Sequence, residues 1–563
     1  MKKTLIFFFC AALAIPAAAQ SWEQALQFSE NNYGGSARSM AMGNALTAVG
    51  GDPGSIGLNP AGSSVAGYSQ FFISPGLSIT SNVAQGVTPE GYSDPVGLAD
   101  RVTSGYTRFK LPNVGFTINM NTGRKTGLKR VSVGFLHNST NDFTDRMESA
   151  GINFGKHSYA GSLASLAQGY STDVMGKADW YAEGAGNQPQ WNSMVGFRCG
   201  MFDLVDGKYL AVTDLFNTSG EPEAAAQLYQ NYGFQSRGYK QDIILNMSAN
   251  FVDKFYIGMN LGITSLNYVE TQFWEERPNG AFPPIHYTDG TVATFNSLLM
   301  NRRYEAKGSG VYFKAGFLWR PVAGLRLAAA VQTPTLVNMT GRCSWYGETN
   351  FTGQYFPSRK SPEDEWLYTL TMPFRFNVGV AYAIGQFGVL SVDYEGVDYR
   401  HSRYGGRSEY NEYSSGAYSN ENADIQDALG FAHNIRAGFE FKPSEALAIR
   451  VGYNFSTGGQ RNWLDWSDGS LTLVPLSDQE RADQCKHAVS FGGGYSFGHF
   501  YADLAVRLRF LPSVYYKPYD HYTYTPGGTY DYVDKYVDVT KETPLVRART
   551  TGIDTVLSFG WRF

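Results

Sequence analysis

The stretch IILNMSANFVDKFYIGMNLGITS, residues 243–265, decides the fold of this chain. Apolar side chains stand at every second position on both sides of the short sequence Val252-Asp253-Lys254, and smaller or polar residues fill the alternate positions. Successive side chains of a β-strand point to opposite faces. The pattern therefore predicts a β-hairpin with one face in an apolar medium and the other in a polar one.

The same alternation recurs along the chain and predicts further hairpins. They cover residues 114–135, 311–331, 374–399, 435–455 and 489–508, with turns near residues 121–129, 320–322, 385–386, 443–444 and 498–499. Residues 70–79 add a first strand and residues 553–563 a last one, which makes fourteen strands. Short and long connections alternate, as in bacterial outer-membrane barrels with an even number of strands. We therefore expect an all-β fold, a fourteen-stranded antiparallel transmembrane β-barrel.

Composition supports a membrane barrel and argues against several other classes. The chain has 37 Tyr and 37 Phe among 563 residues, and no run of 18 apolar residues follows residue 20. Membrane-spanning helices need such runs, whereas a closed barrel satisfies its backbone between strands. With 46 basic and 50 acidic residues the formal net charge is -4. This balance gives no reason to expect a nucleic-acid partner.

The N-terminus carries an export signal. Lys2 and Lys3 precede an apolar run and the small residues Ala17-Ala18-Ala19, the pattern of a secretory signal peptide at residues 1–19. We expect the mature protein in the outer membrane of a Gram-negative bacterium, in contact with membrane lipid. Cys199, Cys343 and Cys485 give neither a disulfide framework nor a metal-ligand spacing, although one pair could oxidise in this compartment.

The segment before the first strand has a different character. Residues 35–67 do not alternate and are rich in Gly, Ala and Met, which favours compact turns and a short helical piece. Because this segment is too apolar for a free tail, its simplest location is buried in the barrel lumen. We therefore divide the mature chain into an N-terminal hatch, residues 20–68, and the barrel, residues 69–563.

This segment resembles a known family. The sequences Ser36-Ala37-Arg38, Ala41-Met42-Gly43, Gly51-Asp52-Pro53 and Asn59-Pro60-Ala61-Gly62 look like the hatch of the FadL/TodX outer-membrane transporters of hydrophobic compounds. The resemblance continues through Trp319-Arg320-Pro321, Thr333-Pro334-Thr335 and residues 390–395 and 433–438. Asn44 and Ser63-Ser64 depart from the pattern and affect how the hatch seats.

The resemblance implies passive uptake of hydrophobic small molecules such as long-chain fatty acids. A ligand would be captured among the outer loops, pass a site above the hatch (Asn59, Pro60, Ala61, Gly62) and leave through a lateral opening at a kink in the third strand. That strand is expected at residues 131–137, and Gly134 is the candidate for the kink; a plain wall glycine is the alternative. The terminal Phe563 is the kind of ending that barrel-assembly machinery recognises.

Candidate capture residues are aromatic side chains of the outer loops, because an apolar ligand needs surface that releases water. They include Phe273, Trp274, Trp345 and Phe356; for each, packing within the loops or a place in the outer aromatic girdle is the alternative. Residues 223–232, after Ser219 and Pro222, are expected to form a short loop helix. Inward-facing charges are expected to form ion pairs that brace the wall and dock the hatch: Lys314, Arg326, Arg375, Asp393, Glu395, Arg436, Glu440, Arg450, Asp503 and Arg507.

We expect no enzyme, metal or cofactor. Gly494-Tyr495-Ser496-Phe497-Gly498 fits a nucleophile-elbow pattern, but it lies on an alternating strand that enters a tight turn. The eight histidines show no zinc spacing, so no catalytic residue is assigned. The alternative function is that of a PorV-like barrel, a partner-binding component of a secretion or envelope assembly.

Overall fold

The structure is a computed structural model that describes residues 21–88, 97–153, 157–177, 180, 189–213, 227–286, 290–407, 413–465, 472–519, 522–525, 529–532 and 543–563. The expected signal peptide, residues 1–19, lies outside the described residues. No helix in the described part of the chain is long and apolar enough to cross a membrane.

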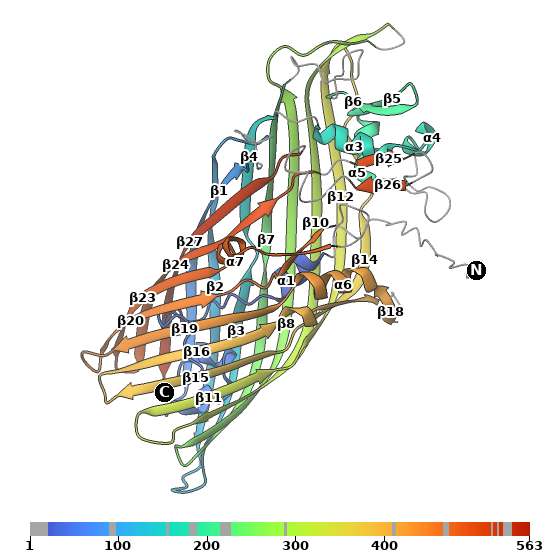
Figure 1. Cartoon of the computed structure of the whole chain (residues 1–563). Coiled ribbons are helices and arrows are strands. Elements are labelled where there is room, and N and C mark those ends of the chain that lie inside the picture. The colour runs from blue at the N-terminus through green and yellow to red at the C-terminus, as the bar shows by residue number, and fades with distance from the viewer. Residues whose placement is uncertain are drawn as a thin grey trace.

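Fourteen antiparallel strands close into a barrel, as predicted (Figure 1). Each strand pairs with the next along the chain, and the last pairs with the first, from Gln70↔Arg562 to Gly86↔Val546. In chain order they are β1 (Gln70–Gly86), β2 (Val102–Asn121), β3 (Leu128–Asp142) continued by β4 (Asp145–Asn153), β7 (Leu228–Phe251), β8 (Phe255–Pro278), β10 (Val292–Trp319), β11 (Leu325–Gln332) continued by β12 (Thr335–Thr352), β14 (Asp364–Met372) continued by β15 (Arg375–Ile384), β16 (Gly388–Asp398), β19 (Phe431–Phe441), β20 (Leu447–Ser456), β23 (Lys486–Phe497), β24 (Phe500–Tyr516) and β27 (Val546–Arg562).

The hairpin of residues 243–265 is confirmed as parts of β7 and β8. Its register runs from Ile243↔Ile263 to Phe251↔Phe255. Val252 and Asp253 both have positive φ, 50° and 57°, the geometry of a tight type I′ turn. The apolar residues Leu245, Met247 and Ile257 are about half exposed on the outer face, at 48%, 52% and 48%.

An apolar belt surrounds the barrel. Large apolar side chains of neighbouring strands are exposed on the outside, among them Phe71, Ile79, Phe116, Leu245, Met259, Phe313, Val380, Val392, Ile449, Phe491, Leu504, Leu557 and Trp561. Such a belt on a closed barrel is stable in a lipid bilayer and would be unfavourable in water. The protein is therefore an outer-membrane barrel.

The strands extend well beyond the predicted segments. β8, for example, continues to Pro278 and β10 begins at Val292, where the sequence predicted only a long connection between the hairpins of residues 243–265 and 311–331. The predicted helix at residues 223–232 is wrong from Leu228 onward, because that part opens β7, while residues 219–226 lie outside the described residues. Beyond the bilayer both faces of a strand meet polar surroundings, so the alternation that reveals a strand fades.

Short elements cover the end of the barrel that carries the long connections (Figure 1). They are α3 (Tyr159–Ala167), α4 (Thr172–Met175), α5 (Trp191–Arg198), β5 (Phe202–Val205), β6 (Lys208–Ala211), β9 (Ile285–His286), β13 (Arg359–Lys360), η4 (Tyr399–His401), β17 (Arg403–Arg407), β18 (Tyr413–Tyr418), α6 (Ser419–Ala428), β21 (Asn462–Asp465), β22 (Thr472–Pro475), α7 (Asp478–Asp483), β25 (Tyr522–Thr525) and β26 (Thr529–Tyr532). The short turns and the C-terminus lie at the opposite end.

Residues 21–69 precede the barrel wall and form α1 (Trp22–Ser29), α2 (Ala37–Ala41), η2 (Pro53–Gly57) and η3 (Pro60–Val65). Almost every residue from Tyr33 to Ser64 is buried. We call residues 21–69 the N-terminal segment.

Candidate functional site

Three short polar motifs give the N-terminal segment its local structure. The Ser36 hydroxyl accepts a hydrogen bond from the Ser39 amide (3.1 Å) at the start of α2. Asp52 accepts one from the Gly54 amide (2.8 Å) and Asn59 one from the Ala61 amide (3.1 Å), each just before a proline that begins a 3-10 turn. A side-chain cap followed by proline at the first helical position is favourable because that proline needs no amide partner. Three of the four N-terminal motifs of the family resemblance are therefore helix starts, and the fourth, Ala41-Met42-Gly43, lies at the end of α2.

The barrel wall contacts this segment through polar side chains of many strands. Lys314 donates to the Gly57 carbonyl (2.8 Å), and Asp393 accepts from the Thr47 amide (2.7 Å). The Arg38 guanidinium binds both carboxylate oxygens of Glu440, at 2.8 and 3.0 Å. The prediction that inward charges brace the wall and contact the N-terminal segment is thus confirmed at these residues.

Several of the other inward charges pair with each other across strands. Glu395 binds Arg375 at 3.2 Å and Arg436 at 2.8 Å, while Arg450 binds Glu440 and Asp503, both at 2.6 Å. All six side chains are at least nine-tenths buried. Buried charges in such numbers are tolerated because each has a partner of opposite sign.

Wall glycines let the backbone of the N-terminal segment approach closely. A Cβ built at Gly316 would lie 2.0 Å from the Asn59 amide oxygen, and one at Gly258 would lie 2.4 Å from the Pro60 carbonyl carbon. A Cβ at Gly452 would lie 2.1 Å from the Gly43 nitrogen. Asn59 and Pro60 of the N-terminal segment are therefore seated against β8 and β10.

Four cationic side chains from four strands bind the first part of the segment. Lys240 donates to the carbonyls of Phe28 (2.7 Å) and Glu30 (2.5 Å), and Arg375 donates to the Ser29 carbonyl. Lys486 pairs with the Glu30 carboxylate at 2.5 Å, and Arg507 donates to the Tyr33 carbonyl at 3.0 Å. The start of the segment is thus held at β7, β15, β23 and β24.

Next to this segment, the wall is interrupted between β2 and β3. Their ladder ends at Asn113↔Asn138, and a single bridge, Asp100↔Ala150, joins the two sides again further along. We call the intervening region, residues 102–112 facing residues 139–149, the wall window. The break is accompanied by an irregularity in the β3–β7 register between Ser139 and Asn141.

The break does not lie at the candidate residue Gly134. Gly134 pairs regularly with Thr117 on one side and Asn246 on the other. A Cβ built at Gly134 would make only ordinary or slightly tight contacts, the nearest at 3.3 Å. Unlike position 316, position 134 therefore does not require a glycine for steric reasons. A kink at Gly134 is therefore not observed.

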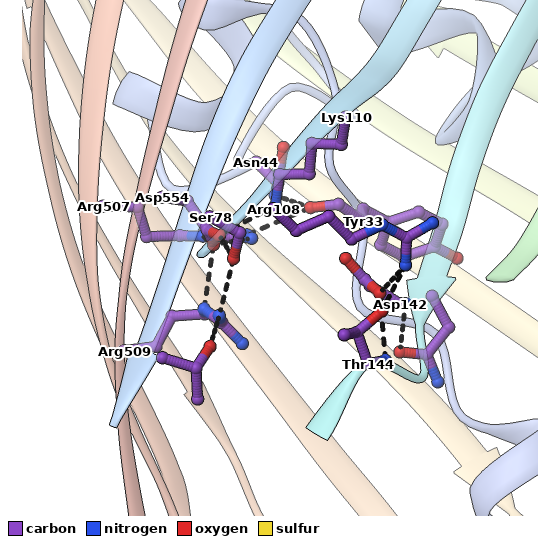
Figure 2. Close-up of polar contacts among 12 residues, drawn as sticks. Tyr33, Asn44, Ser78, Arg108, Lys110, Asp142, Thr144, Arg507, Arg509 and Asp554 are labelled. Carbon is purple, nitrogen blue, oxygen red and sulfur yellow. Dashed lines mark hydrogen bonds and ion pairs between the residues drawn. The ribbon is translucent and has the colours of Figure 1, made fainter. Parts of the chain in front are cut away.

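A cluster of charges lies on the inner side of β1, β2, β24 and β27 beside the wall window (Figure 2). Lys110 and Arg507 contact the buried Asp554 carboxylate, each at 2.7 Å, and Arg509 contacts it at 2.8 Å. Ser78 also donates to Asp554 (2.7 Å). Three cations around one carboxylate leave positive charge at the inner mouth of the window.

The loop-covered end holds a cavity of about 760 Å³. Phe356, predicted as a capture residue, lines it together with Phe197, Phe202 and Trp180, while Arg359 and Lys360 supply positive charge. The volume is in the range of small-molecule sites, and the lining mixes the aromatic rings with charged side chains of both signs, Asp203 among them.

The other three candidate capture residues lie in packed surroundings. Trp274 is 7% exposed, stacks on Tyr159 with ring centroids 4.9 Å apart, and donates its indole N–H to the Pro518 carbonyl (2.6 Å). Trp345 stacks against Trp274 at 5.9 Å, and Phe273 lies over Gly233. Phe356 alone of the four lines this cavity.

Other observations bear on chemistry. Residues 494–498 end β23, and β24 follows where a nucleophile elbow needs a helix. Cys199, Cys343 and Cys485 are all free thiols. No group of three or more metal-binding side chains occurs among the residues that the structure describes.

Sequence reasoning missed Arg108, Lys110, Lys240 and Lys486. Lys240 and Arg108 lie in regions predicted to be loops or loop borders, where the alternation is weak. Extending the inward positions of each strand by a few residues is the signal that could have found Lys240.

No protein-family model and no curated protein matches the chain. Among solved structures, the chain is similar to a FadL homologue of Pseudomonas aeruginosa, with 12% identity over 94% of this chain and 99% of that chain and a TM-score of 0.49. It is also similar to the toluene transporter TodX of Pseudomonas putida (12% identity, 95% and 100% covered, TM-score 0.45). A third is the toluene transporter TbuX of Ralstonia pickettii (12% identity, 94% and 98% covered, TM-score 0.42).

Proposed function

We propose that this outer-membrane barrel takes up hydrophobic small molecules passively, with long-chain fatty acids as the leading ligand class. The observation that carries the proposal is the wall window, which lies beside a lumen filled by the N-terminal segment. A filled lumen blocks a straight aqueous path, whereas a break in the wall at the level of the apolar belt offers a sideways path into lipid. Apolar solutes are the molecules that gain free energy on that path.

The cavity at the loop-covered end supports the same function. Its aromatic lining suits an apolar chain, and Arg359 and Lys360 suit a carboxylate head group. Each methylene buried there contributes about 0.8 kcal/mol, so affinity should rise about fourfold per added CH₂ until the cavity is full. Residues 59–62 lie nearer the short turns than the window does, because Pro60 contacts Asn246, which pairs with Gly134, and the window begins after Asn138. They then act as part of a hatch that closes the lumen on that side of the window, as the family resemblance implies.

Uptake into proteoliposomes tests the proposal. Labelled palmitate and toluene are added to vesicles with wild-type protein, with protein lacking residues 21–66, and without protein. Uptake above that of empty vesicles supports the proposal, and a preference between the two probes identifies the ligand class. Rates equal to those of empty vesicles for both proteins and both probes would overturn it.

A second candidate is the PorV-like role of holding a protein partner at the membrane. The hairpin β5–β6 favours it, because Leu204, Val205 and Leu210 are 40%, 48% and 37% exposed on the loop-covered end. Co-purification of a stoichiometric envelope protein that is lost on replacing these three residues with serine would support this role over uptake.

A further inference from the structure

Arg108 spans the wall window. One of its terminal nitrogens donates to the Asp142 carboxylate at 2.7 Å and to the Gly238 carbonyl at 3.1 Å, and it also contacts the Thr144 hydroxyl (Figure 2). Arg108 belongs to β2, whereas its acceptors belong to the end of β3, the bend that follows it, and β7. One guanidinium thus connects β2 to both strands beyond the window.

The N-terminal segment competes with β2 for backbone hydrogen bonds at the start of the window. The carbonyls of Ser139 and Thr140 accept hydrogen bonds from the amides of Gly34 (3.2 Å) and Asn32 (2.6 Å). These acceptors are therefore already occupied at the point where β3 leaves β2.

The opposite edge is also unsuited to a ladder. Pro112 of β2 has no amide hydrogen to donate, and a Cβ on Gly34 would lie 2.8 Å from the Pro112 Cβ, so the segment packs against β2 here. Closure of the window consequently depends on side chains. Ser104 makes a second contact across the window, at the end away from Pro112. Its hydroxyl donates to the Arg146 carbonyl at 2.9 Å.

We propose that Arg108 is the latch of the wall window: its contacts to Asp142, Thr144 and Gly238 hold β2 against β3 and β7, and their release widens the window. The role of the latch in transport rests on the proposed function. The widening of the window does not, because it can be measured without transport. The Arg108 and Asp142 side chains are 33% and 25% exposed, so the pair is partly screened. We expect loss of the latch to raise the population of the wide state about tenfold.

The distance across the window tests the latch without any transport measurement. Nitroxide labels are placed by Thr107→Cys and Glu148→Cys in a background in which Cys199, Cys343 and Cys485 are serine, and the distance distribution is measured by pulsed electron resonance in nanodiscs. Arg108→Gln removes the charge and the guanidinium donors, whereas Arg108→Lys keeps the charge. Asp142→Asn weakens the main acceptor of Arg108.

Two controls accompany these variants. Arg303→Gln removes an arginine that is 47% exposed and pairs with Glu305 of its own strand, so it should leave the window unchanged. A label pair at Thr107 and Ile553 spans β1, where Ile79 pairs with both labelled residues, and should report no change in any variant.

A longer distance in Arg108→Gln and Asp142→Asn, with an intermediate effect of Arg108→Lys, supports the latch. Distributions in Arg108→Gln identical to those of wild type and Arg303→Gln would overturn it, provided that the heat-modifiable gel shift shows folded barrels. Palmitate uptake is measured on the same samples. A wider window without faster uptake counts against the proposed function and leaves the latch standing.

Discussion

Replacing Arg38 with glutamine is expected to loosen the N-terminal segment from the wall. Arg38 makes a two-pronged ion pair with Glu440, at 2.8 and 3.0 Å, and the two side chains are 19% and 0% exposed. Glu440 keeps Arg450 at 2.6 Å after the substitution, so its charge is not left unpaired. The cost is therefore below the 3–5 kcal/mol of an orphaned buried charge, and we expect about 2 kcal/mol.

This free energy corresponds to a rise of about 30-fold in the population of the unseated segment. Ser39→Cys provides the reporter, because Ser39 is buried in α2 next to Arg38, in a background with Cys199, Cys343 and Cys485 changed to serine. A polar maleimide reacts with this thiol only when the segment opens. Its labelling rate in outer-membrane vesicles is then proportional to the unseated population.

Lys442→Gln is the matched control. Lys442 contacts the same carboxylate at 3.7 Å but is 45% exposed, so its removal should cost less than about 1 kcal/mol, at most about fivefold in rate. The reasoning would be refuted by an Arg38→Gln rate within about fivefold of the parent. Equal effects of the two substitutions would refute it as well.

Three further outcomes are expected. Burial raises the pKa of the Cys199 thiol to about 12, so its reaction with a disulfide reagent at pH 8 should be about a thousandfold slower than that of a free thiol and should rise tenfold per pH unit, as absorbance kinetics will show. Leu557→Arg, on the lipid face of β27, should destabilise the barrel by about 2–4 kcal/mol in urea-induced unfolding from lipid vesicles, whereas Leu557→Phe should cost under about 1.5 kcal/mol. Gly452→Val should unseat the N-terminal segment, because even its Cβ meets the Gly43 backbone; a Ser39→Cys labelling rate equal to the parent's would contradict this contact.

The local alternation of side chains was enough to predict the strands of the barrel wall. The alternation in residues 243–265 predicted both strands, the turn and the outward face, because a strand between lipid and a polar lumen must separate its two sets of side chains. The same alternation placed Glu395, Arg436 and Glu440 inside, and their burial with partners follows from the high cost of charge in lipid. Along β12, where Leu336 is the one large apolar side chain that is exposed, the pattern weakened and the prediction gave a loop.

The candidate site depended on contacts between distant residues. The family resemblance implied a kink in the third strand, and Gly134 was the candidate for it, since glycine weakens a ladder. The structure shows regular pairing at Gly134 and a break after Asn138, where Asn32 and Gly34 take the carbonyls of Thr140 and Ser139. That competition joins residues about a hundred positions apart, and no local pattern contains it.

The sequence by itself thus determined a closed barrel with an apolar exterior, a charged interior and a compact segment to fill it. These properties depend on whether each side chain faces lipid or the lumen. Because successive side chains of a strand point to opposite faces, the alternation in the sequence indicates that environment for each residue. Only the tertiary structure decided where the ladder between β2 and β3 breaks, which side chains cross that break, and which aromatic residues line a cavity. Each of those depends on which backbone groups remain unpaired once the barrel has closed around its N-terminal segment.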